Sequence, residues 1–149
     1  MTSNGSTIPE LLENPAAREA LFRDAEDVLA DRVAQSRGLT GMAIRTGFSA
    51  FQRVQPGIVG LAVARLAPHF APILETHWAV ARETDNRVAY FTMHAPTIAN
   101  DLLSVTDGMA DRAKNAVLVS IYRSLRGRAE AEVASAMPDV AGLLERHLG

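Results

Sequence analysis

Apolar residues recur along this chain at the three- and four-residue spacing of an α-helix, and this periodicity is the feature that most constrains the fold. One apolar stripe runs from Leu21 to Val33, and the opposite helical face is charged. No segment sustains the alternation of a half-buried strand; residues 88–93 are ambiguous, and we read them as helical because predicted helices flank them. The sequence predicts an all-α fold, a single-domain bundle of about seven or eight amphipathic helices over residues 7–149. We expect residues 1–6 to form a disordered tail.

Capping residues mark the first helix starts. Thr7 and Glu10 have the spacing of a capping box, which predicts a short helix over residues 9–13. Asn14 followed by Pro15 predicts the start of the next helix, because Asn accepts hydrogen bonds from the first turn and Pro fits the first helical position.

The middle of the chain predicts two further helices. Thr40 can cap a helix over residues 41–54, in which Gly47 permits close packing, and we expect Gly57 to end it with a positive φ. The next helix, residues 57–66, is apolar nearly all round and is predicted to be central and buried. A further helix is predicted to begin at one of two prolines, Pro68 or Pro72.

Towards the C-terminus we expect a turn at residues 106–108, in which Asp107 caps a helix rather than acting as a base. A long helix is predicted over residues 114–136, and Pro138 begins the last one.

Composition excludes several function classes. The net charge of −2 is unlike that of a generally basic nucleic-acid coat, and the absence of cysteine excludes thiolate chemistry.

The apolar stretch 58–74 is too short and too interrupted to span a bilayer, so we expect a buried core segment and no membrane span. The N-terminal residues lack the pattern of a secretory signal, so we expect a cytoplasmic protein. Fourteen of the fifteen basic residues are Arg, which together with 25 Ala suggests a high-GC bacterium.

Scattered positions in the last third carry a family resemblance. They include the runs Leu102-Leu103-Ser104-Val105-Thr106-Asp107 and Tyr122-Arg123-Ser124-Leu125-Arg126-Gly127. In this respect the chain resembles an uncharacterised domain-of-unknown-function family of small all-helical proteins from high-GC bacteria, over roughly residues 20–148. The resemblance implies a bacterial, helical, intracellular protein, and it implies no activity, cofactor or catalytic residue.

A basic stretch is the first candidate site. Its members could hold a phosphate or an acidic partner if one continuous helix aligned them: Arg112, Lys114, Arg123, Arg126 and Arg128. The alternative is a solvated face whose cations pair with acidic residues of other turns and helices: Glu26, Asp27, Glu130 and Glu132.

Aromatic side chains suggest a second candidate, an apolar ligand pocket. Its lining would be Phe48, Phe51, Phe70, Trp78 and Tyr90. Residues 46–49 also resemble the turn of a helix-turn-helix activator, but Pro56 follows too soon for a full recognition helix. We find no catalytic or metal-binding motif and expect neither enzyme activity, nor a metal, nor a cofactor.

Function is therefore not specified by any motif. The first hypothesis is a non-catalytic intracellular interaction or oligomerisation module; the second is a helical protein that binds a small apolar ligand; the third is an anion or nucleic-acid binder through the basic stretch. Residues 38–74 contain no Asp or Glu, and so large an apolar segment predicts self-association as a symmetric dimer. We therefore expect a protein partner, a second copy or another chain, rather than nucleic acid.

Overall fold

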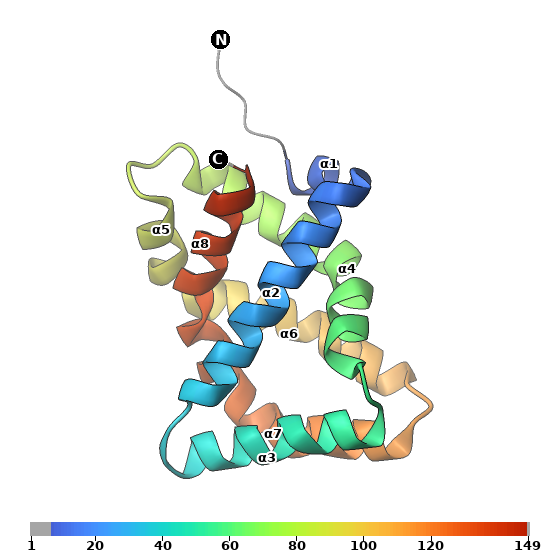
Figure 1. Ribbon diagram of the computed structural model, residues 1–149. Coiled ribbons are helices and arrows are strands. Elements are labelled where there is room, and N and C mark those ends of the chain that lie inside the picture. Colours follow the sequence, from blue (N-terminus) through green and yellow to red (C-terminus); the bar gives the residue numbers. More distant parts are fainter. Residues whose placement is uncertain (1–6, 149) are drawn as a thin grey trace.

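A computed structural model describes residues 7–148, in which all regular structure is helical (Figure 1). The all-α prediction is confirmed, including the ambiguous residues 88–93, which lie in a helix. The predicted tail, residues 1–6, lies outside the described residues. The eight helices are α1 (Ile8–Glu13), α2 (Pro15–Gln35), α3 (Gly38–Val54), α4 (Ile58–Ala81), α5 (Arg87–Met93), α6 (Ala95–Arg112), α7 (Ala116–Ser135) and α8 (Met137–Leu148).

The predicted caps of the first two helices are confirmed. The Glu10 amide donates to Thr7 Oγ1 at 3.2 Å, and the Thr7 amide donates to Glu10 Oε1 at 2.8 Å. Asn14 Oδ1 accepts from the amides of Ala16 and Ala17, both at 3.1 Å. These bonds satisfy amides that the first helical turn leaves without partners, so α1 and α2 begin where the sequence places them.

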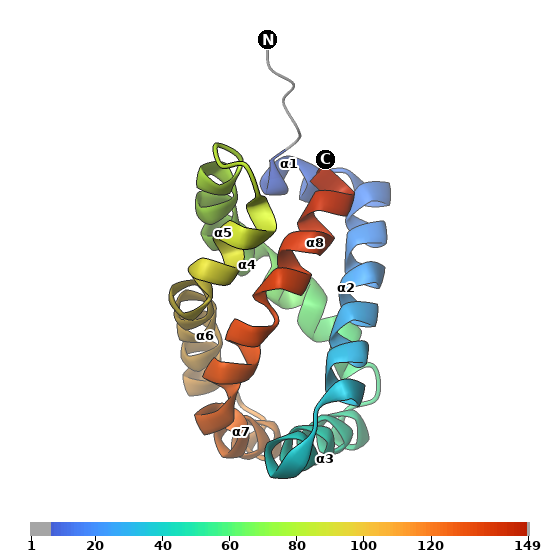
Figure 2. The same cartoon turned by 90° about the vertical axis from the view of Figure 1, so that its left-hand side faces the viewer.

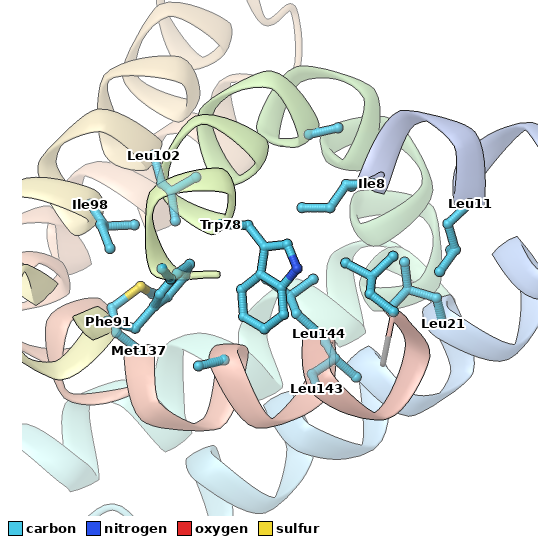
Figure 3. Packing of buried hydrophobic residues seen from close by; sticks show 14 of the residues in the cluster. Ile8, Leu11, Leu21, Trp78, Phe91, Ile98, Leu102, Met137, Leu143 and Leu144 are labelled. Carbon is cyan, nitrogen blue, oxygen red and sulfur yellow. The ribbon is translucent and has the colours of Figure 1, made fainter. Parts of the chain in front are cut away.

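The hydrophobic core gathers at one end of the molecule. Trp78 lies at its centre, fully buried, and its ring meets Phe91 edge to face with 5.8 Å between the centroids (Figure 3). Side chains from α1, α2, α4, α5, α6 and α8 surround this pair, among them Ile8, Leu11, Leu21, Ile98, Leu102, Met137, Leu143 and Leu144.

The other end of the molecule is a layer of two helices. α3 and α7 lie side by side there, and they remain together when the molecule is turned by 90° (Figures 1 and 2). No residue of α7 is buried, and the buried positions of α3 are Gly41 and Gly47. Every side chain of α3 and α7 is therefore at least partly exposed to solvent, and the buried core lies at the other end of the molecule.

The predicted central helix differs from the structure. Residues 58–67 are all at least partly exposed, and they continue through Pro68 and Pro72 as the single helix α4. Both prolines are exposed and lie four residues apart on one side of α4, so the carbonyls that lose their amide partners face water. Within residues 7–148, α4 is the one helix long and apolar enough to cross a bilayer, judged by length and composition alone.

Two other local predictions are corrected, and three are confirmed. α3 begins at Gly38 without a side-chain cap from Thr40. It runs through residues 46–49 as one helix, as the prediction of a helix over residues 41–54 requires, so the likeness of these residues to an activator turn does not extend to their structure. Residues 106–108 lie inside α6 rather than in a turn. Gly57 has the expected positive φ of 81°, and the close approach predicted at Gly47 is present.

Candidate anion-binding site

Gly47 brings α3 and α7 into close contact. A Cβ atom placed on Gly47 would lie 2.5 Å from Cδ1 of Leu125 in α7, closer than non-bonded carbon atoms approach. Any larger residue at position 47 would therefore push the two helices apart or displace Leu125. Glycine at this position thus allows α3 and α7 to approach closely where they cross.

This surface is strongly segregated in charge. We call residues 37–57 and 112–129 the basal layer; they comprise α3, its flanking turns, the end of α6 with the turn that follows, and most of α7. The basal layer holds eight of the fifteen basic residues and none of the seventeen acidic ones. The rest of the chain holds seven basic and seventeen acidic residues, so a protein of net charge −2 presents one cationic end. The eight are Arg37, Arg45, Arg53, Arg112, Lys114, Arg123, Arg126 and Arg128.

One helical arc of α3 carries the polar groups of this surface. At 100° per residue, its exposed residues between positions 39 and 53, apart from Thr40, fall within about 140°. Five of them line an open depression of about 600 Å³: Arg45, Thr46, Ser49, Gln52 and Arg53. The larger apolar residues Phe48 and Phe51 lie outside this exposed arc and are partly buried.

Two of the predicted basic residues pair with α6. Arg126 donates two hydrogen bonds to Asp107, from Nε to Oδ1 at 2.8 Å and from Nη2 to Oδ2 at 3.0 Å. Arg123 donates from Nη2 to Asp111 Oδ1 at 2.9 Å. The sequence suggested acidic partners such as Glu26 and Glu130, and that suggestion is wrong for these two cations. α6 packs against α7, so the carboxylates of α6 pair with them instead.

The remaining cations of the basal layer are not ion-paired. In the described part of the chain no carboxylate lies within 4.0 Å of the charged groups of Arg37, Arg45, Arg53, Arg112, Lys114 or Arg128. Arg45 donates to the backbone carbonyl of Ser36, which leaves its charge uncompensated. The condition that one continuous helix carries Arg112 to Arg128 is not met, because the turn after α6 interrupts it, yet all five predicted residues belong to the basal layer.

A cluster of polar side chains joins α7 to α6 by hydrogen bonds. Tyr122 Oη donates to Asp107 Oδ1 at 2.6 Å and lies 2.6 Å from Thr106 Oγ1. Hydrogen bonds from Arg126 and then Tyr122 hold the pKa of Asp107 below its usual value. Burial, and then the hydrogen bond to Asp107, raise the pKa of Tyr122. An aspartate held ionised and a tyrosine held neutral suit a structural clamp rather than proton transfer near neutral pH.

A second open depression of about 500 Å³ lies where α6 turns into α7, and its polar lining comes from Asp111, Lys114, Ser120 and Arg123. The start of α7 is already capped there, because Asn115 Oδ1 accepts from the amides of Val117 and Leu118 at 3.0 and 3.1 Å. An anion in this depression would meet side-chain cations rather than free helix amides.

The predicted aromatic residues do not line one pocket. Trp78 is completely buried. Tyr90 packs against the same core through Phe91, with 6.1 Å between the Tyr90 and Phe91 ring centroids. Phe70 is partly buried against the same core. Phe48 and Phe51 belong to α3 at the opposite end of the molecule (Figure 1), so the five side chains divide between core and basal layer. Phe91 is the core aromatic that sequence reasoning missed.

The model of DUF6918, a family of unknown function, matches residues 8–148. The chain belongs to DUF6918. This membership confirms the resemblance to a domain-of-unknown-function family. No curated protein and no solved structure matches the chain. Among its described residues, no three His, Asp or Glu side chains gather into a group that could hold a metal ion. The charge of the basal layer is the feature of this DUF6918 protein that points to a function.

Three of the eight basal cations were not predicted from sequence as site residues: Arg37, Arg45 and Arg53. Each stands alone among uncharged residues and belongs to no recognised motif. The available signal was a second acid-free segment, residues 112–129, in addition to residues 38–74. Taken together, the two segments would have singled out the helices that the fold places side by side.

Proposed function

We propose that this protein is a non-catalytic interaction module that binds a negatively charged partner through its basal layer. The observation that carries the proposal is the segregation of eight basic and no acidic residues into the basal layer, residues 37–57 and 112–129, whose helices α3 and α7 adjoin. The six cations without carboxylate partners are available to an incoming anion without breaking an ion pair. Five of these six are Arg, whose planar guanidinium matches phosphate and carboxylate groups with two parallel hydrogen bonds.

The expected affinity is moderate. A Lys or Arg close to an anionic surface contributes about 1 kcal/mol at physiological ionic strength. Engagement of four of the six would supply about 4 kcal/mol before any apolar contact is made. Binding of this kind weakens as salt is added, because exposed charges are screened over about 8–10 Å.

The same charge argues against a symmetric dimer through this layer. A two-fold axis would oppose one basal layer to another, and the six cations without carboxylate partners would face six more. The acid-free residues 38–74 that predict self-association from sequence are better explained by an acidic partner. A dimer, if it forms, needs another surface.

Composition supports proposals on source and location. The preference for Arg over Lys and the high Ala content favour a high-GC bacterial protein, and we propose that it works in the cytoplasm. Fractionation of the source organism, with the protein followed by antibody, tests the location.

Charge reversal on α3 tests the proposed function. Arg45→Glu with Arg53→Glu should weaken binding to heparin, used as a polyanionic probe, by roughly a thousandfold, because each reversal removes one attraction and adds one repulsion of about 1 kcal/mol each. The matched control is Arg18→Glu with Arg23→Glu, near the start of α2 at the opposite end of the molecule (Figure 1). Equal affinities for the two double variants, or no binding by the unaltered protein at low salt, would overturn the proposal.

A further inference from the structure

We infer that the negatively charged partner is an anionic lipid surface, on which the basal layer lies peripherally. This inference rests on the proposed function and names its partner. Charge alone does not separate a bilayer from nucleic acid or an acidic protein. The exposed apolar side chains that lie among the cations favour a bilayer over the other two partners.

Large apolar residues are unusually exposed on this layer. Seven such residues are exposed in the part of the chain that the structure describes, and four belong to the basal layer: Leu39 at 81%, Met42 at 57%, Val54 at 39% and Val117 at 56% exposure. A phosphodiester backbone gains nothing from aliphatic side chains beside the cations. The boundary between lipid headgroups and acyl chains gains from both.

On α3, Leu39 and Met42 share the cationic arc, whereas Val54 lies about 60° beyond its edge. Leu39 and Met42 are three positions apart and lie within about 60° of each other, and Arg45 and Arg53 fall on the same exposed side. A helix with exposed aliphatic residues, flanking arginines and no acidic residue has the pattern of one that lies in a membrane interface.

The second helix extends the pattern to the other end of the layer. α3 and α7 run in opposite directions (Figure 1), and they cross where Gly47 meets Leu125. Val54 lies seven residues after Gly47, and Val117 lies eight residues before Leu125, so both belong to the same end. Apolar contacts thus stand at both ends of the layer with cations between them. Two adjoining helices present a broad surface, whereas the helical DNA-binding motifs place one recognition helix in the major groove.

The packing of α4 favours docking at the surface over insertion. α4 is apolar enough to span, with a mean hydropathy of 1.3 over its most apolar window, and only 6% of that window is buried. Its second half nevertheless supplies Ala71, Trp78 and Ala81 to the hydrophobic core. Inserting α4 would dismantle that core, so the bundle docks as one body.

Vesicle binding tests the inference. The probes are vesicles of phosphatidylcholine alone, vesicles that also contain about one third phosphatidylglycerol, heparin and duplex DNA. Leu39→Ser with Met42→Ser should weaken binding to the anionic vesicles about tenfold and leave heparin binding unchanged, because only the lipid surface buries these side chains. The control is Val80→Ser with Met93→Ser, which changes two residues at 50% and 76% exposure outside the basal layer. Melting curves check that each variant folds.

The outcomes separate the two proposals. Anionic vesicle binding that the basal double variant weakens and the control does not supports the lipid assignment. Tight binding to heparin or duplex DNA, with anionic vesicles bound no better than neutral ones, overturns the lipid assignment and leaves the proposed function standing. Equal vesicle binding by both double variants also overturns the lipid assignment. Failure to bind any anionic probe overturns both.

Discussion

A double-mutant cycle at the crossing of α3 and α7 tests the geometry on which the basal layer depends. Helix propensity by itself favours Gly47→Ala by about 1 kcal/mol of unfolding free energy, because Ala is the better helix former. The added Cβ, however, would lie 2.5 Å from Leu125 Cδ1 and 3.0 Å from its Cγ and Cδ2. Overpacking of this kind costs about 1–3 kcal/mol, so the single variant should range from unchanged to about 2 kcal/mol less stable.

Leu125→Ala removes all three of the atoms that the new Cβ would meet. In that background Gly47→Ala should therefore stabilise the protein by the full helix-propensity gain of about 1 kcal/mol. The expected coupling between the two sites is about 1–3 kcal/mol, measured from urea unfolding of the four proteins with the fluorescence of Trp78 as the signal. A gain of about 1 kcal/mol in both backgrounds would refute the close crossing, since the two residues would then not touch.

Three further predictions follow from the same structure. Gly57→Val should lower stability by about 1–2 kcal/mol, because φ at this position is +81° while no neighbouring atom obstructs a side chain; an unchanged melting temperature would show that the backbone strain is absent. The unaltered protein should be more stable than Asp107→Asn above about pH 5, and the difference should vanish as the pH falls through the lowered folded pKa of Asp107, so a difference that persists fully in acid contradicts the Arg126 clamp. Asp111→Asn should release Arg123 and strengthen heparin binding severalfold, while the melting temperature hardly changes because the pair is exposed; weaker binding would contradict the account.

Local capping chemistry was predictable from sequence because it acts within a few residues. Thr7 with Glu10 and Asn14 with Pro15 each place a hydrogen-bonding side chain three residues or fewer from the amides it satisfies. Gly57 was predictable for the same reason, since a residue after Pro56 at a helix joint needs a φ that only Gly adopts cheaply.

The continuity of α4 was not predictable from its prolines alone. Pro68 and Pro72 stop a helix when the freed carbonyls are buried, and these two lie on the solvent side. Which side of a helix meets water depends on the packing of the other helices. The half-exposed first turns of α4 depend on packing too, because they project beyond the core formed by its second half.

The candidate site was predictable in part. The five basic residues from Arg112 to Arg128 do lie in the basal layer, but the carboxylates that neutralise two of them come from α6. The contribution of Arg45 and Arg53 arises only when α3 packs against α7, a contact between segments about 70–80 residues apart in the chain. Tertiary contacts of this kind carry no local sequence signal.

Hydrogen–deuterium exchange in the presence of heparin locates the anion-binding surface without any substitution. We expect slower amide exchange in Gly38–Val54 and Ala116–Ser135 on adding heparin at low salt, reversed by raised salt, with α1, α5 and α8 unchanged. Protection confined to α1, α5 or α8, or exchange that heparin does not alter anywhere, would contradict the assignment of the basal layer as the anion-binding surface.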